Sequence, residues 1–315
     1  MTNTTLNELK LGWIGTGRMG YAMVSRLLKH GCDVAVYNRT RSKAEPLIAL
    51  GATVVNSPVD LASRDIVFTM VSGPDDLIEV VSGASGVLSH ENHAPKLLVD
   101  CSSVSTEASA AVRKQAAIRG MAMLAAPVSG NAKVVKAGQL SVVASGPEEQ
   151  YRIAEPLLAL LGRGVSYVGE GELARMVKIC HNILLGVLTQ SLAEITILAE
   201  KGGVPRHAFL DFMNKSVLGS VFTKYKSPAF VNLDWTPTFT PYLLRKDLDL
   251  GLEAGRSLGV PQPLTALTRE IVQSMIGNGY QDVDFGALLE LQAKASGLEL
   301  KSEQKAIDDG LGGES

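Results

Sequence analysis

The chain has 315 residues and a formal net charge of −2, and 46% of its residues are hydrophobic while only 5% are aromatic. This length favours two domains that share one active-site cleft, and the composition suits parallel strands packed under helices. The sequence contains no long run of charged residues of one sign, which excludes the electrostatic pattern of a protein that binds nucleic acid or anionic membranes.

Residues 9–171 alternate between short apolar runs and helical patterns. Lys10–Gly15, Met19–Lys29 and Asp33–Tyr37 are predicted as a strand, a helix and a strand. The alternation continues through predicted strands at Thr53–Val55, Ile66–Val71, Leu97–Val99, Met123–Leu124 and Ser141–Ala144, and through helices near Lys43–Leu50, Asp75–Val81, Thr106–Arg119 and Glu148–Leu161. Repeated β–α units predict an N-terminal Rossmann domain with a doubly wound sheet.

The pattern changes after a last predicted strand at Val165–Val168. Glu172 to about Lys201 is one long apolar-rich stretch without proline, which predicts a single interdomain helix. The segments that follow are also helical in pattern: Pro205–Asn214, Thr240–Gly259, Pro263–Gly277 and Asp284–Ala295. We therefore predict an α/β fold with an all-α domain at 172–300, and the charged, glycine-rich end, 301–315, is expected to be a flexible tail.

A G-x-G-x-x-G motif follows the first predicted strand and opens the first helix: Gly15, Thr16, Gly17, Arg18, Met19 and Gly20. Gly15 permits a tight turn, Gly17 lets the backbone approach a pyrophosphate, and Gly20 lets helix and strand pack closely. A merely glycine-rich turn is the alternative, and the complete β–α–β unit around the motif argues against it. We assign all six residues to a dinucleotide site.

The end of the second predicted strand bears on the choice between NAD(H) and NADP(H). An NAD enzyme usually carries Asp or Glu there to bind the ribose hydroxyls, whereas this chain has Asn38, Arg39 and Thr40. The missing carboxylate removes repulsion of a 2′-phosphate, and Arg39 offers a fork of donors. NADP(H) is therefore the predicted cofactor. NAD(H) stays open, because these basic residues could instead belong to a solvent-exposed loop that does not bind a 2′-phosphate.

Five short motifs occur in order along nearly the whole chain: Gly12-x-x-Gly15-x-Gly17-x-Met19-Gly20, Asp100-Cys101-Ser102-Ser103, Pro127-Val128-Ser129-Gly130, Lys178-x-x-x-Asn182 and Lys246-Asp247-Leu248. Together they resemble the β-hydroxyacid dehydrogenase family, which includes 3-hydroxyisobutyrate dehydrogenase, tartronate semialdehyde reductase and glyoxylate/succinic semialdehyde reductases. The resemblance implies hydride transfer between NADP(H) and a small 3-hydroxy acid or its semialdehyde or 2-oxo-acid counterpart. It also implies that the helical domain binds substrate and forms a homodimer or homotetramer.

The resemblance implies that Lys178 is the general acid/base and that Asn182 orients the lysine or the substrate. Independent support comes from their spacing, because residues four apart share one face of a helix. The neighbouring residues are mostly apolar, and poor hydration lowers the pKa of a lysine toward the operating pH. The alternative is a lysine whose stem covers the core while its ammonium reaches water.

The resemblance places the substrate carboxylate at Ser129 and Gly130, where a hydroxyl and approachable backbone amides can converge. The family's usual aspartate and second glycine beside this turn are Ala126 and Asn131 here, so the edge of the pocket is altered, and Asn131 is included for its backbone amide and side chain. The remaining cofactor-site residues are Val71, Ser103 and Lys246.

Three other functions stay open as alternatives. An imine reductase would keep the cofactor, but those relatives generally lack the lysine. A non-catalytic protein with a dehydrogenase fold is disfavoured because the lysine, the Ser-Gly turn and the glycines are all present. Relatives of 6-phosphogluconate dehydrogenase usually need a larger helical domain.

The cellular setting is inferred from cysteines and from the N-terminus. Cys32, Cys101 and Cys180 lack CxxC spacing, which indicates reduced thiols, and no metal site is indicated beside Cys180–His181. Met1–Glu8 lacks the pattern of a targeting segment. We therefore expect a cytoplasmic protein whose partners are a small-molecule substrate and copies of itself, with no nucleic acid and no membrane.

Overall fold

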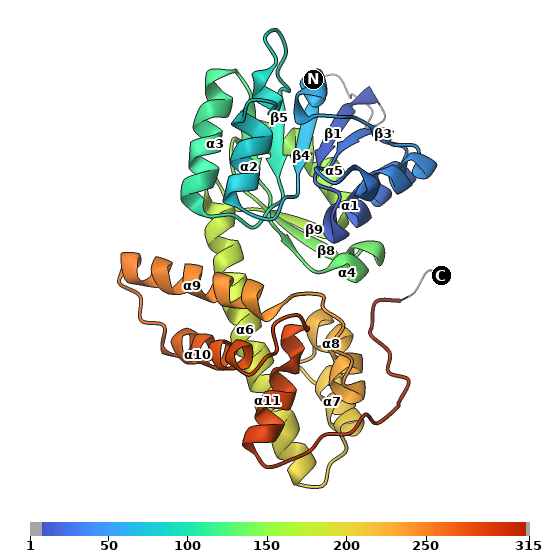
Figure 1. Cartoon of the computed structure of the whole chain (residues 1–315), viewed down its shortest axis with the longest axis vertical. Helices are drawn as coiled ribbons and strands as arrows, with labels where there is room; N and C mark the ends of the chain where they lie inside the picture. The colour runs from blue at the N-terminus through green and yellow to red at the C-terminus, as the bar shows by residue number, and fades with distance from the viewer. Residues whose placement is uncertain (1–7, 313–315) are drawn as a thin grey trace. The chain divides into compact units, whose positions relative to one another are not determined.

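The computed structural model describes residues 8–312 and divides into two compact units, Met1–Lys178 and Ile179–Ser315 (Figure 1). The expected fold class is confirmed, with an N-terminal Rossmann domain and a C-terminal helical domain. The long helix α6 (Leu173–Lys201) contains the boundary between the two units. The expectation for Met1–Glu8 rests almost entirely on residues 1–7, which lie outside the described residues.

The N-terminal unit is built on a six-stranded parallel sheet of order β3-β2-β1-β4-β5-β6. Its strands are β1 (Lys10–Ile14), β2 (Asp33–Tyr37), β3 (Thr53–Val54), β4 (Ile66–Thr69), β5 (Leu97–Asp100) and β6 (Ala122–Ala125). The strand order reverses direction beside β1, and ligands of open α/β sheets bind at such a switch point, outside the carboxyl ends of the strands.

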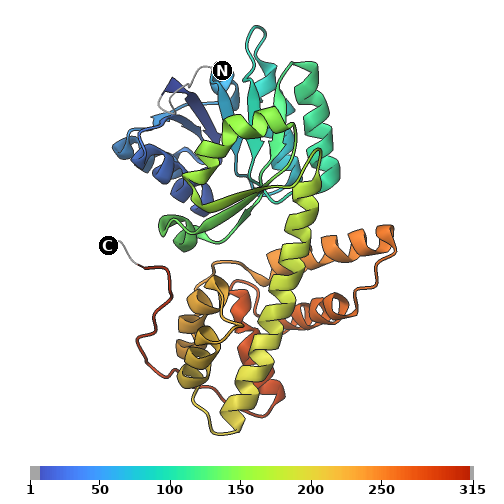
Figure 2. The same cartoon turned by 180° about the vertical axis from the view of Figure 1, so that it is seen from behind.

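Helices cover both faces of this sheet, as Figures 1 and 2 show. On one face lie α1 (Arg18–Lys29) and α5 (Glu148–Ala159), and on the other lie α2 (Pro74–Ser82) and α3 (Thr106–Ile118). The strands are buried on both sides because alternate residues enter different cores. Val34 and Val36 of β2 pack in the first core, and Ala35 packs in the second.

Two parts of the N-terminal unit differ from the prediction. Strands β7 (Val128–Ser129), β8 (Leu140–Ala144) and β9 (Gly162–Tyr167) form a separate sheet rather than extending the doubly wound one. Pro127, which lacks an N–H, separates β6 from β7, and β7 then pairs antiparallel with β8. The expected helix at Lys43–Leu50 is instead 3₁₀, as η2 (Arg41–Lys43) and η3 (Glu45–Leu50), with Pro46 at the start of η3.

Smaller elements complete the chain: α4 (Ala132–Lys136), η4 (Pro58–Leu61), η5 (Val87–Ser89) and η6 (Phe285–Ala287). The helical unit contains the rest of α6 with α7 (Arg206–Lys215), α8 (Val221–Asn232), α9 (Pro241–Leu258), α10 (Pro263–Gly277) and α11 (Leu288–Ala295). Helix α8 was expected only as part of the all-α domain and was given no bounds of its own, because Pro228 lies inside it and its apolar residues form no clear stripe.

Helix α6 passes, among the described residues, the length and composition test for a membrane span. Of its most apolar stretch, 44% is buried inside the structure, and the core helix of a protein that never enters a membrane passes the same test. Leu192, Ala193 and Ile197 of α6 lie in the core of the helical unit.

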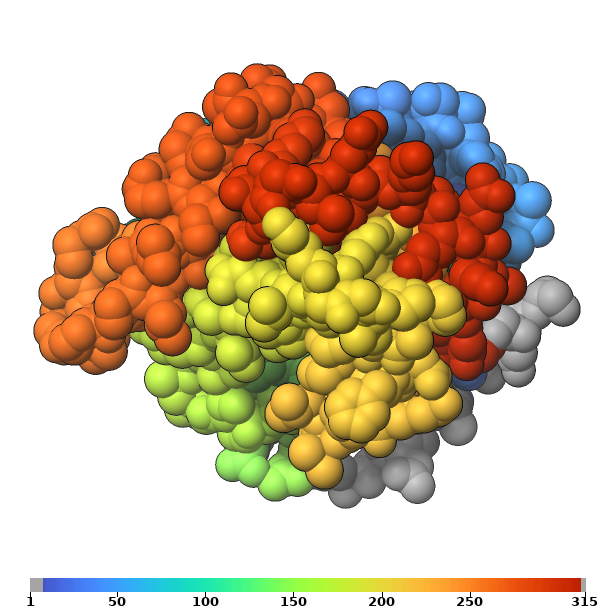
Figure 3. All heavy atoms as spheres, turned by 90° about the horizontal axis from the view of Figure 1, so that it is seen from below, coloured from blue at the N-terminus to red at the C-terminus, as the bar shows by residue number. Residues whose placement is uncertain are grey.

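The segment after α11 differs from the flexible tail that its composition suggests. Glu303 accepts hydrogen bonds from the backbone N–H groups of Arg206 (2.7 Å) and His207 (3.0 Å) at the start of α7. Asn232, at the end of α8, exchanges two hydrogen bonds with the backbone of Lys305. Figure 3 shows the red C-terminal segment against the yellow helices. The expectation of a flexible tail is thus wrong for 301–305, because its partners lie in helices far away in the sequence.

Candidate functional site

The glycine-rich turn between β1 and α1 has the backbone geometry that its motif predicts. Gly15 has a φ of +96°, and a Cβ there would lie 2.2 Å from the backbone oxygen of Met70. A Cβ on Gly20 would lie 1.9 Å from the backbone oxygen of Gly15. Gly17 faces open space and precedes α1 without a capping side chain. The first N–H groups of α1, at Arg18 and Met19, therefore fit an anion such as a pyrophosphate.

Gly15→Ala is expected to weaken NADPH binding at least about tenfold, because the side chain needs a strained φ and clashes with backbone. Fluorescence titration of the nicotinamide measures this change, with a thermal melt to record folding. Gly164→Ala is the matched control, since Gly164 lies in β9 with open space around the new methyl. Equal affinities in Gly15→Ala and wild type would contradict the assignment of the turn.

Asn38 ties this turn to the end of β2. Its Oδ1 accepts a hydrogen bond from the backbone N–H of Thr16 (2.8 Å), and its Nδ2 donates to the backbone oxygen of Thr40 (2.9 Å). The hydroxyl of Thr16 is buried and has no hydrogen-bond partner within residues 8–312. The amide of Asn38 thus shapes the turn that would bind the cofactor, and the predicted contact of Asn38 with the cofactor stays a prediction.

Arg39 reaches from the end of β2 to the first turn of α2. Its Nη1 lies 2.9 Å from Oδ1 of Asp76, and 81% of the Arg39 side chain is exposed. Thr40 is also exposed. A guanidinium at this place fits a phosphate on the ribose, since the ribose of a dinucleotide lies at the end of the second strand.

The carboxyl ends of β4 and β5 bring two other predicted residues to the same edge of the sheet. Val71 follows β4, and its backbone N–H donates to Oγ of the buried Ser102 (2.9 Å). Ser103 is the next residue after Ser102 and is half-buried. Thr69 donates to Asp100 (2.7 Å), which joins the two strands through side chains.

Arg175, on the first turns of α6, holds this edge and was not recognised in the sequence. Its guanidinium pairs with the buried carboxylate of Asp100 and donates to the backbone oxygen of Ser102 and to Oγ of Ser109. The Arg175 side chain is only 1% exposed. Lys178 follows three positions later on the same helix, so these bonds also fix the turn that carries the lysine.

Ser129, Gly130 and Asn131 form the turn between β7 and α4. Gly130 has a φ of +136°, which favours glycine, and Ser129 is half-buried. Oδ1 of Asn131 accepts hydrogen bonds from the N–H groups of Lys133 (3.0 Å) and Val134 (3.1 Å). The Asn131 side chain therefore caps α4, which is a structural reason for its presence at a position where the family usually has glycine.

Lys178 and Asn182 both lie on α6, and the lysine is half-buried. Nδ2 of Asn182 donates to Oδ2 of Asp247 on α9 (2.6 Å), and Nδ1 of His181 lies 2.9 Å from Oδ1 of Asn182. Nζ of Lys246 lies 3.3 Å from the other oxygen of Asp247. Asp247 thus joins two predicted site residues.

Two known families match consecutive parts of the chain. Residues 10–169 match the NAD binding domain of 6-phosphogluconate dehydrogenase, and residues 172–292 match the family described as NAD-binding of NADP-dependent 3-hydroxyisobutyrate dehydrogenase. Glyoxylate/succinic semialdehyde reductase 2 of Arabidopsis thaliana is 31% identical over 95% of this chain and 83% of its own length. The chain belongs to the β-hydroxyacid dehydrogenase family.

Two more relatives agree with this membership. The 2-(hydroxymethyl)glutarate dehydrogenase of Eubacterium barkeri is 32% identical over 94% of this chain and 99% of its own length. A structure of Mycobacterium tuberculosis 3-hydroxyisobutyrate dehydrogenase with L-serine is 26% identical, with a TM-score of 0.77 over 90% of this chain and 98% of that one. The chain is therefore a member of a family of oxidoreductases, and its N-terminal part matches an NAD-binding domain.

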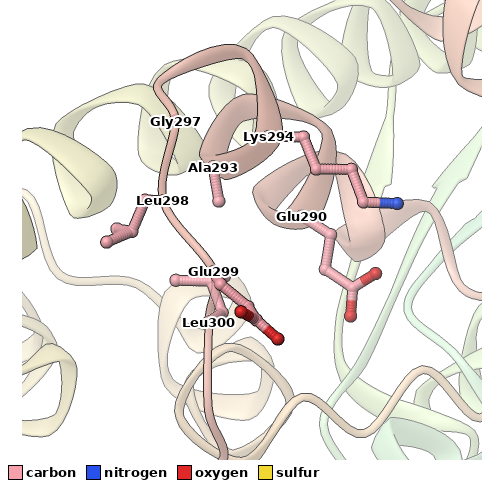
Figure 4. Close-up of a pocket in the computed structure, with 7 residues that line it drawn as sticks. All are labelled: Glu290, Ala293, Lys294, Gly297, Leu298, Glu299 and Leu300. Atoms are coloured by element: carbon pink, nitrogen blue, oxygen red, sulfur yellow. The ribbon is translucent and has the colours of Figure 1, made fainter.

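The helical unit of this β-hydroxyacid dehydrogenase also contains a cavity of about 450 Å³ (Figure 4). Two of its charged side chains have partners in the protein: Glu290 accepts hydrogen bonds from Trp235 and Tyr280, and Lys294 donates one to Tyr280. None of the predicted site residues lines it. Within residues 8–312, no group of three His, Cys, Asp or Glu side chains could hold a metal ion.

Proposed function

We propose that this chain reduces the carbonyl of a small oxo-acid or semialdehyde with NADPH as the preferred cofactor, and that Lys178 is the general acid. The observation that carries the proposal is the Lys178 and Asn182 pair on one face of α6, in which Asn182 is held by a buried carboxylate. The reverse oxidation would use the same groups, with Lys178 as the base.

The bound dinucleotide would supply the hydride, and the turn from Gly15 to Gly20 would hold its pyrophosphate. The preference for NADPH is supported by the guanidinium of Arg39, which could bind a 2′-phosphate, and by Asn38 in place of a carboxylate at the end of β2. Val71, Ser103 and Lys246 are proposed on the cofactor side of the site.

Lys178 would donate a proton to the oxygen that becomes an alkoxide during reduction. Asn182 would bind the substrate with its second Nδ2–H, because the first donates to Asp247 and its Oδ1 faces His181. Ser129 and the backbone around Gly130 would bind the substrate carboxylate.

The name of the Arabidopsis relative suggests glyoxylate and succinic semialdehyde as substrates to test, and the family resemblance adds methylmalonate semialdehyde and tartronate semialdehyde. Oxidation of NADPH and NADH by the purified chain would be followed with each acid. Butyraldehyde is the matched control for succinic semialdehyde, since it has the same chain length without the carboxylate. We expect turnover of at least one acid and not of the control.

Other outcomes of this assay identify the alternatives. Reduction of a cyclic imine without turnover of any oxo-acid would support an imine reductase. Dinucleotide binding without turnover of either class would support a non-catalytic dehydrogenase-fold protein.

We also propose that the chain forms a homodimer or homotetramer through its helical unit. Large apolar side chains are exposed on α6 and α10, including Leu184 (64%), Leu264 (65%) and Leu267 (62%), and such exposure marks interaction surfaces when the residues form a patch. Light scattering during gel filtration is expected to give the mass of two or four chains. Leu264→Lys combined with Leu267→Lys is expected to shift it toward one chain, whereas a wild-type monomer would contradict the proposal.

A further inference from the structure

An ion pair crosses the edge of the sheet where the adenosine part of a dinucleotide would lie. Strand β1 pairs with β2 on one side and with β4 on the other, so the segments after β2 and β4 flank the glycine-rich turn. Arg39 follows β2, and Asp76 lies in the first turn of α2, after β4. Their side chains meet across the turn at 2.9 Å.

Asp76 introduces a negative charge beside the guanidinium that would recognise a 2′-phosphate. A phosphate monoester carries a charge of about −1.5 to −2 near neutral pH, so the carboxylate would repel it and compete with it for the donors of Arg39. NADH has a hydroxyl at this place, and a carboxylate can accept a hydrogen bond from that hydroxyl. Asp76 therefore opposes the effect of Arg39 on cofactor choice.

We propose that Asp76 is a specificity-determining residue that restrains the preference for NADP(H) over NAD(H). This inference rests on the cofactor site proposed above. The pair contributes little to folding, because 81% of the Arg39 side chain and 30% of the Asp76 side chain are exposed, and exposed pairs are weak. The main consequence of the Arg39–Asp76 pair is for the choice between NADP(H) and NAD(H).

Asp76→Asn tests the proposal, since it keeps the shape and removes the charge. Asp75→Asn is the matched control: Asp75 lies in the same first turn, is exposed, and its substitution makes the same change in net charge. The affinities of the purified full-length chain for NADPH and for NADH would be measured by nicotinamide fluorescence. This readout requires no turnover.

We expect Asp76→Asn to raise the ratio of NADPH affinity to NADH affinity about three- to tenfold at low salt, as expected for one charge at short range. The change is expected to shrink at about 1 M salt, where the Debye length is about 3 Å. Asp75→Asn is expected to change the ratio less than about twofold at both salt concentrations, because within residues 8–312 the ion pair of Arg39 is with Asp76 and not with Asp75.

An unchanged ratio in Asp76→Asn, or equal changes in both variants, would overturn the proposal. An unchanged ratio in a chain that still reduces an oxo-acid would overturn this inference alone. A raised ratio in a chain that turns over no substrate would support the inference while the proposed reaction fails.

Discussion

Replacing Lys178 with methionine is expected to lower kcat for oxo-acid reduction by about 10²–10⁴-fold, the contribution typical of a general acid. Methionine is unbranched and apolar, so the half-buried stem of the lysine is largely replaced while the ammonium is removed. NADPH affinity is expected to stay within about threefold of wild type, because the turn from Gly15 to Gly20 is unchanged. Stopped-flow reduction and fluorescence titration measure the two quantities separately.

The pH profile distinguishes a proton donor from a structural lysine. In wild type, the rate of reduction should fall with rising pH, because a neutral amine cannot donate a proton. The rate of oxidation should rise with rising pH, because the base must be neutral. Both pH dependences should be missing in Lys178→Met. Lys201→Met, at the other end of α6, is the control. Activity that survives in Lys178→Met with an unchanged profile would contradict the proposed role.

The parts of the site that could be predicted are those decided by neighbours in the sequence. The roles of Gly15 and Gly20 follow from local backbone geometry, and the structure contains the close approaches that they predict, while Gly17 faces open space. Lys178 and Asn182 could be placed on one face because helical spacing alone decides it. The fold class was predictable for the same reason, since each β–α unit has its own periodicity.

The partners of these residues could not be predicted, because they come from distant elements. Asp247 contacts Asn182 only after α9 packs beside α6. Asp76 contacts Arg39 only after β2 and β4 pair with opposite sides of β1, so that the segments after both strands lie at the same edge of the sheet. A charged residue in a helical pattern is usually solvated, so burial of Asp247 had no local signal. Its place next to Lys246 in a family motif was the available indication.

The side chains of Asn38 and Asn131 also have partners within the protein that the sequence did not reveal. Both were predicted to contact ligands, and in both the amide oxygen accepts hydrogen bonds from the protein backbone. Asparagine suits turns and helix starts as well as binding sites, so the predicted ligand contacts of Asn38 and Asn131 stay predictions.

Substitution of Arg175 is the other change for which the structure predicts a large effect. Arg175→Met is expected to lower the free energy of unfolding by about 3–5 kcal/mol, because removing one partner of a buried pair leaves the other charge without compensation. Asp100 is fully buried, and its remaining partners, Thr69 and the N–H of Ser102, are neutral donors. Urea unfolding followed by circular dichroism measures the change.

Two further variants separate a buried-charge effect from simple loss of contact. Arg152→Met removes a pair with Glu148 whose side chains are 69% and 55% exposed, and it is expected to cost less than about 1 kcal/mol. Adding Asp100→Asn to Arg175→Met removes the uncompensated charge and is expected to recover part of the lost stability. If Arg175→Met costs no more than Arg152→Met, the buried pair does not hold the start of α6, and the position of Lys178 must be fixed by other contacts.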